Sequence, residues 1–125
     1  MRAAIDAWNR GDWDAAFAQA APDVVLDNSM VQGEYRGVHR GVPEAQEMFA
    51  RFVEPWDSVR VEIEELVENG ERVFTRMRGH FAGRDGIEVR SLTGACWIFS
   101  GDVITTILLP NDPNEAREAA GLPLS

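Results

Sequence analysis

A change in hydrophobic period divides this chain into two parts. Apolar and charged residues alternate from Val59 to Glu64, and from Val73 to Phe81 neutral residues alternate with Phe74, Arg76, Arg78 and His80. A period of two residues is typical of β-strands that bury one face. Asn69-Gly70 lies between the two runs, and this dipeptide favours a tight hairpin turn. The alternation therefore predicts long antiparallel strands in the second half of the chain.

Two more turn signals follow this hairpin. The segment 83–86 contains two glycines, and Ser100-Gly101-Asp102 has the composition of a third turn. They predict a long strand over residues 87–99 and a last strand from Val103 to Leu109. Asp112-Pro113 is then expected to begin a short helix that ends near a glycine.

Helical signals dominate the N-terminal segment. Apolar side chains recur at helical spacing over residues 2–10 and again over residues 13–20. Between the two runs, Gly11 can adopt the positive φ that ends a helix. Asp12 can then accept hydrogen bonds from the first turn of the next helix. Two short helices joined by a tight break are therefore expected.

Proline residues divide the segment that follows. Pro22 is expected to end the second helix, and residues 24–28 are strand-like. A short strand is expected around Glu34–Arg36, within a stretch punctuated by glycines. Pro43 suits the first turn of a third helix, which Pro55 stops. Helices followed by an antiparallel meander indicate the α+β class.

Composition narrows the classes of partner. The length of 125 residues predicts one domain over residues 1–125. The formal net charge of −9 argues against nucleic acid and anionic membrane surfaces as partners. No apolar run approaches the ~18 residues of a membrane-spanning helix. All 12 basic residues are arginine, which is typical of a GC-rich bacterial genome.

Metal-binding residue types are scarce. Cys96 is the sole cysteine, and His39 and His80 are the two histidines. We therefore expect neither a metal site nor another cofactor. Met1-Arg2 leads into an amphipathic helix and not into an apolar signal segment, so a cytoplasmic protein is expected. The shortness of the first predicted helix is consistent with further residues before Met1 in the native protein.

Several short motifs, taken in their order, resemble the SnoaL-like group of the nuclear transport factor 2-like superfamily. These motifs are Ala7-Trp8-Asn9-Arg10-Gly11-Asp12, Pro22-Asp23-Val24-Val25, Tyr35-Arg36-Gly37, Trp97-Ile98-Phe99 with Gly101, and Ala116 through Gly121-Leu122. The resemblance covers nearly the whole chain. It implies a cone-shaped, curved antiparallel sheet that packs against N-terminal helices around a central pocket. It also implies frequent homodimers through the outer face of the sheet.

The resemblance does not imply one reaction, because the relatives include ketosteroid isomerases, limonene epoxide hydrolases, polyketide cyclases and proteins without known activity. The base carboxylate of the isomerases maps to Asn28, their oxyanion tyrosine to Ala4 and their second oxyanion acid near Ala95. An amide cannot abstract a proton at neutral pH. The epoxide hydrolases have an asparagine at the position of Asn28. Their remaining catalytic residues map to uncharged positions, namely Leu26, Met77, Gly79 and Leu108.

The leading hypothesis is a neutral pocket that binds a small, largely apolar, uncharged molecule. Its predicted ligand-binding residues are neutral, namely Leu26, Asn28, Trp56, Thr75, Met77, Thr93, Ala95, Trp97, Thr106 and Leu108. Trp8 and Trp13, in contrast, are expected to pack in the core.

The second hypothesis is an isomerase, a cyclase or an epoxide-hydrolase-type enzyme that acts on a polyketide, steroid-like or terpenoid substrate by acid–base chemistry. A register slip of one residue would turn Asp27 or Arg78 inward. Asp27 would then be the base, with its pKa raised by desolvation, and Asn28 or His39 the donor.

The third hypothesis is a non-catalytic homodimerising module. Arg76, Arg78 and His80 share one face of the strand predicted over residues 72–82. The apolar residues between them require the core side, so this basic face is expected to be the outer face of the sheet and not an anion site. There it would pair with glutamates of the neighbouring strand, such as Glu62 and Glu64.

Overall fold

The computed structural model describes residues 2–28, 37–83, 85–110 and 112–123. Helices and strands follow one another in a mixed order. They are α1 (Arg2–Asn9), α2 (Trp13–Ala16), β1 (Ala20–Asp27), β2 (Val38–Arg40), α3 (Val42–Val53), β3 (Ser58–Asn69), β4 (Arg72–Ala82), β5 (Glu88–Ser100), β6 (Val103–Leu108) and α4 (Pro113–Ala119).

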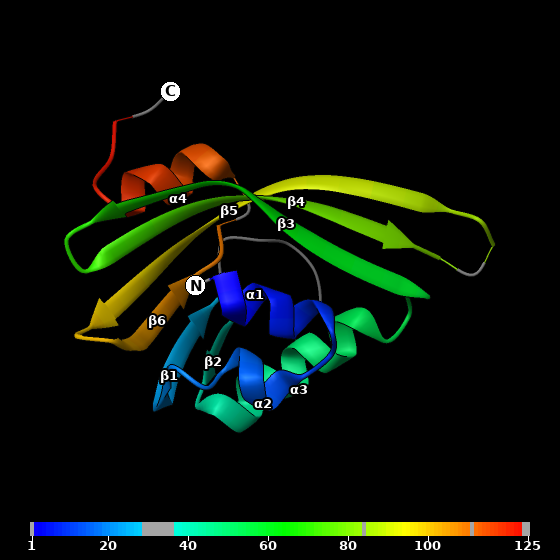
Figure 1. Cartoon of the computed structure of the whole chain (residues 1–125), viewed down its shortest axis with the longest axis horizontal. Coiled ribbons are helices and arrows are strands. Elements are labelled where there is room, and N and C mark those ends of the chain that lie inside the picture. The colour runs from blue at the N-terminus through cyan, green and yellow to red at the C-terminus, as the bar shows by residue number, and fades with distance from the viewer. Residues whose placement is uncertain (1, 29–36, 84, 111, 124–125) are drawn as a thin grey trace.

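One curved sheet, which does not close into a barrel, contains the six described strands in the order β2-β1-β6-β5-β4-β3. Helices α1, α2 and α3 lie on one side of it and α4 on the other (Figure 1). The predicted α+β class and the packing of a curved sheet against N-terminal helices are confirmed. One neighbouring pair, β1 and β6, is parallel, whereas an antiparallel sheet was expected. The long connection through α3 and four described strands allows β6 to return beside β1 in the same direction.

The predicted meander of β3, β4, β5 and β6 is confirmed. β3 and β4 pair from Ser58 opposite Ala82 to Asn69 opposite Arg72, so the hairpin turns at the predicted dipeptide. Gly70 has a φ of 65°, which is the left-handed conformation that such a turn requires. Met77 pairs with Ile63 and Thr93, and its side chain belongs to the buried core.

The break between the first two helices also forms as predicted. Gly11 has a φ of 71°. The side chain of Asp12 accepts a hydrogen bond from the Ala15 N–H at 3.2 Å, which satisfies one free donor of the first helical turn.

The second helix is shorter than predicted, because α2 ends at Ala16 and β1 begins at Ala20. The Ile104 N–H donates to the Gln19 carbonyl oxygen at 2.8 Å, and Ala20 pairs with Ile104. Pairing with β6 therefore ends the helix several residues before the proline that was expected to stop it.

The structure describes only part of the segment between β1 and α3. The strand expected around Glu34–Arg36 lies outside the described residues. α3 has Pro43 in its first turn, as predicted. At the other end of the chain, Asp112 caps α4 by accepting from the Asn114 N–H at 2.9 Å, and Gly121 follows with a φ of 76°.

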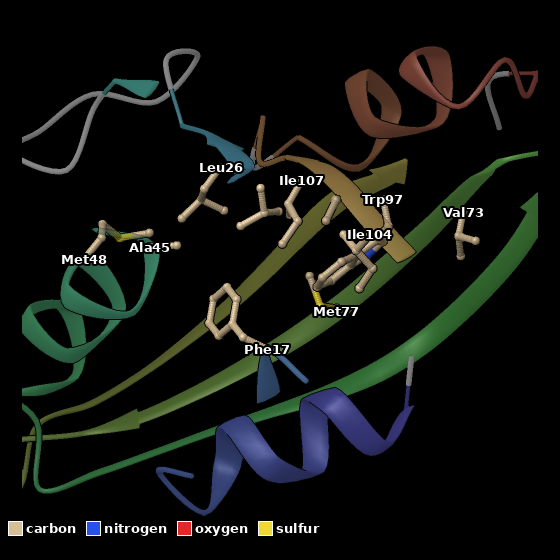
Figure 2. Close-up of a cluster of buried hydrophobic side chains, with 11 residues drawn as sticks. Phe17, Leu26, Ala45, Met48, Val73, Met77, Trp97, Ile104 and Ile107 are labelled. Atoms are coloured by element: carbon tan, nitrogen blue, oxygen red, sulfur yellow. The ribbon is translucent and has the colours of Figure 1, made fainter. Parts of the chain in front are cut away.

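The sheet separates two apolar clusters. The larger cluster lies between the sheet and α1–α3, and it includes Phe17, Met48 and Trp97 (Figure 2). The smaller cluster lies beneath α4 and centres on Phe74 and Cys96. No described helix is long and apolar enough to cross a membrane.

Basic side chains of β4 lie on the face opposite the larger cluster, as predicted. Arg78 Nε lies 3.2 Å from Glu64 Oε2, and Arg76 Nε lies 3.7 Å from Glu64 Oε1. His80 Nε2 lies 3.8 Å from Glu62 Oε2. Partly exposed ion pairs of this kind add little stability, but they identify the outer face of the sheet.

Candidate functional site

A cavity of about 270 Å³ lies between the sheet and α1–α3. Its helical wall is apolar because the inward faces of α1 and α3 carry alanine, aliphatic and aromatic residues. These residues are Ala4, Ile5, Trp8, Met48, Phe49 and Phe52. The segment from the end of α2 to the start of β1 adds Ala16, Phe17 and Ala20.

The opposite wall consists of strand residues on the concave face of the sheet. Because side chains alternate along β5, Ser91, Thr93 and Trp97 all lie on the cavity side. The other strands of this wall contribute Asn28, Val61, Met77, Gly79, Phe81, Ile104, Ile107 and Leu109. Figure 2 shows several of the lining side chains, among them Phe17, Met48, Met77, Trp97 and Ile107, within the larger apolar cluster.

Aromatic rings pack tightly along the helical wall. Trp8 makes edge contacts with Trp13 and with Phe49, each with ring centroids 5.8 Å apart. Phe17 lies 6.0 Å from Phe49. Aromatic pairs at these separations contribute beyond their buried area. The expectation that Trp8 packs only in the core was incomplete, since one side of it borders the cavity.

The described residues that line the cavity carry no charged side chain. None of these lining residues is Asp, Glu, Arg or His, and the polar side chains other than tryptophan are Asn28, Ser91 and Thr93. The indole N–H of Trp97 is already bound, because Nε1 donates to Thr75 Oγ1 at 2.8 Å.

Four of the predicted ligand-binding residues line the cavity, namely Asn28, Met77, Thr93 and Trp97. Leu26, Thr75 and Ala95 are fully buried on the same side of the sheet, but they lie in the packed core behind the lining. Trp56 is also absent from the described lining. Its ring packs on the ring of the lining residue Phe81, with the two centroids 5.3 Å apart.

Thr106 and Leu108 do not line the cavity, and here the prediction was wrong. The pairing of β5 with β6 shifts between Ile98 and Phe99, because one extra residue of β6 lies between Ile104 and Thr106. Such a bulge reverses the facing of the residues that follow. Leu108 therefore packs in the cluster beneath α4, and Ile107 and Leu109 take the inward positions.

The three predicted catalytic residues lie close together where β1 pairs with β2, since His39 is opposite Leu26, but they do not all line the cavity. Asp27 lies between Leu26 and Asn28, which are buried on the core side, so alternation turns its carboxylate to the other face of β1. His39 is on β2, and its Nδ1 lies 3.7 Å from Glu44 Oε1 on α3. Of the three, Asn28 alone lines the cavity.

Sequence reasoning also missed Ser91 and the phenylalanines of the helical wall. Ser91 was detectable, because it stands two residues before Thr93 on the same strand and so shares its face. Across the described part of the chain, no three His, Cys, Asp or Glu side chains are grouped so as to hold a metal ion.

A sequence model described as the SnoaL-like domain matches residues 1–106. A search of curated proteins finds no significant match. Among solved structures, TerC co-crystallised with polyporic acid is 17% identical, with a TM-score of 0.78 over 96% of this chain and 94% of TerC.

Two further solved structures share the fold. An NTF2-like protein of unknown function from Burkholderia pseudomallei K96243 is 21% identical, with a TM-score of 0.78 over 94% of this chain and 91% of that one. RV0760c from Mycobacterium tuberculosis, in complex with estradiol-17β-hemisuccinate, is 13% identical, with a TM-score of 0.73 over 86% and 87%. At these identities the likeness shows the fold alone.

Proposed function

Because this chain belongs to the SnoaL-like domain family, we propose that its cavity binds a small, largely apolar, uncharged organic molecule. Proteins that share a fold of this kind have many different functions, so the function has to be inferred from the residues that line the cavity. The observation that carries it is the lining, which is aromatic and aliphatic apart from a few neutral polar groups. Binding sites for small organic molecules have this composition.

Energetics favour the same class of ligand. Apolar surface gains about 25 cal/mol for each Å² removed from water, so an apolar molecule is stabilised in this space. A charged group would lose its hydration and find no opposite charge on the described lining, which is strongly unfavourable. An uncharged ligand therefore suits the cavity better than an ionised one.

Two of the similar structures support a ring-containing ligand. TerC was co-crystallised with polyporic acid, and RV0760c with estradiol-17β-hemisuccinate. The rings of Trp8 and Phe49 offer a comparable molecule flat apolar contacts in this chain.

Acid–base catalysis is the less supported function. A catalytic base has to come within hydrogen-bond reach of its substrate. The Asp27 carboxylate faces away from the cavity, and His39 lies beside Glu44 outside the described lining. The neutral lining thus favours binding over proton transfer by these two residues.

A thermal-shift screen tests the proposal, with steroids, aromatic polyketide fragments and terpene epoxides as probes. A ligand at about a hundred times its Kd stabilises the folded state by roughly 2.7 kcal/mol, which raises the Tm by several degrees for a chain of this size. We expect such a rise for at least one of these classes.

A matched pair of variants tests whether a rise in Tm comes from binding in the cavity. Ala4 lines the cavity, whereas Ala3 is exposed on the same helix. Ala4→Phe should fill part of the space and abolish the Tm rise, and Ala3→Phe should leave it intact. A rise that survives Ala4→Phe, or no rise with any class, would contradict the proposal.

A further inference from the structure

Two hydroxyl groups of β5 open into the cavity without a protein partner. Ser91 and Thr93 are two residues apart on the same face of the strand, and both line the cavity. Within the described part of the chain, neither side chain makes a hydrogen bond. Both residues are partly exposed, and a hydroxyl can donate one hydrogen bond and accept two. These two hydroxyls are therefore available to a bound molecule.

The other polar groups near the cavity are already engaged. Thr75 accepts the indole N–H of Trp97, which uses that donor within the core. Asn28 has interactions of its own with the protein. The available hydrogen-bonding capacity of the lining is thus concentrated at one place on β5, while the rest of the wall is apolar.

The Ser91 hydroxyl and the Phe81 ring pack closely over Gly79 of the neighbouring strand. Gly79 of β4 pairs with Ser91. A Cβ at Gly79 would lie 2.6 Å from Ser91 Oγ and 2.7 Å from Cε2 of Phe81, so a larger residue would displace both. The absence of a side chain at this position therefore makes room for the Ser91 hydroxyl and the Phe81 ring, both of which line the cavity.

The cavity volume indicates the size of a ligand that the cavity can hold. A protein cavity of about 150 Å³ holds one benzene molecule. The present cavity of about 270 Å³ is somewhat less than twice as large. A compound with two fused rings fits this volume.

We propose that the preferred ligand is an apolar two-ring compound with one neutral oxygen group, a hydroxyl or a carbonyl, which hydrogen-bonds to Ser91 and Thr93. This inference rests on the proposed function and specifies its ligand. The rings lie against the aromatic wall formed by Trp8 and Phe49, and the oxygen points to β5. Hydrogen bonds to the two hydroxyls select this compound over the corresponding hydrocarbon.

Calorimetric titration with naphthalene and 2-naphthol separates the two claims, because these probes differ by one hydroxyl. Naphthalene tests apolar binding alone, and the ratio of the two Kd values tests the hydroxyl site. We expect 2-naphthol to bind the unmodified protein roughly threefold to tenfold more tightly than naphthalene, as one or two net hydrogen bonds would give.

Three variants locate the origin of this preference. Thr93→Val keeps the shape of the side chain and removes its hydroxyl, and Ser91→Ala does the same at the neighbouring position. The double variant should bind both probes with Kd values within about twofold of each other. Ser100→Ala removes an exposed hydroxyl of the same strand outside the cavity, and it should preserve the preference.

The possible outcomes are distinct. A preference for 2-naphthol that disappears in the double variant supports the inference. Equal affinities in the unmodified protein, or a preference that persists in the double variant, would overturn it while naphthalene binding still supports the proposed function. If neither probe binds, the proposed function fails for molecules of this size and the inference fails with it.

Discussion

The side-chain amide of Asn9 binds both backbone groups of Val61. Its Nδ2 donates to the Val61 carbonyl oxygen and its Oδ1 accepts from the Val61 N–H, each at 2.8 Å. β3 is an edge strand among the described strands, so these backbone groups have no strand partner on that side. Since Val61 itself lines the cavity, this contact fixes α1, one wall of the cavity, to the edge of the sheet.

Loss of this contact should destabilise the protein. Asn9→Ala leaves two partly buried backbone groups without their partner, and we expect the free energy of unfolding to fall by about 1–3 kcal/mol. Urea denaturation measures this change. Asp6→Ala, at an exposed position of the same helix, should change stability by less than about 0.5 kcal/mol. Equal stabilities of the two variants would show that the contact contributes nothing.

The buried bond between Trp97 and Thr75 should appear as coupling between the two positions. Thr75→Val leaves the indole N–H of Trp97 without its acceptor, whereas Trp97→Phe removes the donor. We therefore expect Thr75→Val to cost about 1 kcal/mol less in the Trp97→Phe background than in the unmodified protein. A double-mutant cycle by urea denaturation gives this difference. Additive effects would mean that the bond does not stabilise the fold.

The thiol of Cys96 should make stability depend on alkaline pH. Burial raises the pKa of this thiol, and the charge and hydrogen bond of Arg72 partly oppose the rise. With a higher pKa in the folded state, the folded protein keeps a proton that the unfolded chain loses above about pH 8.5. Folding stability from this group is therefore present below that pH and is lost as the pH rises through the folded pKa.

Cys96→Ala isolates this effect. The difference in unfolding free energy between the unmodified protein and the variant should be constant up to about pH 8 and should shift against the unmodified protein at higher pH. Denaturation curves between pH 7 and pH 10 provide the comparison. Two parallel pH profiles would show that the thiol does not titrate differently in the folded state.

Close packing of α4 on β5 requires a glycine at position 94. A Cβ on Gly94 would lie 2.6 Å from Pro113 Cα and 2.9 Å from the Ala116 Cβ. Gly94→Ala should therefore lower the free energy of unfolding by about 1–3 kcal/mol, since the helix has to move outward. The matched control is Gly83→Ala, because a Cβ at Gly83 meets its neighbours at 3.7 Å or more. If thermal denaturation shows that Gly83→Ala is less stable than Gly94→Ala, this explanation of Gly94 is wrong.

Local sequence patterns predicted those parts of the fold that depend on neighbouring residues alone. The helix break at Gly11 and Asp12 formed as expected, because capping needs only the adjacent turn. The facing of Met77 was also correct, since neutral and basic residues alternate from Thr75 to Phe81 and the neutral face has to be buried.

Other parts depended on contacts that no local pattern reveals. The extra residue of β6 lies in the run Ile104-Thr105-Thr106-Ile107, where either face is compatible with the residue types, so the shift that turned Leu108 outward was not predictable. Helical spacing placed Ile5 and Trp8 on one buried face. Whether that face meets packed side chains or a cavity depends on how far α1 stands from the curved sheet.

Methyl NMR of methionine-labelled protein tests the central claim most directly. Two of the four methionines, Met48 and Met77, line the cavity from opposite walls. During titration with naphthalene, the account predicts that the methyl resonances of both residues shift together and saturate at one common Kd. If calorimetry detects binding while neither resonance moves, the ligand binds elsewhere and the cavity is not the binding site.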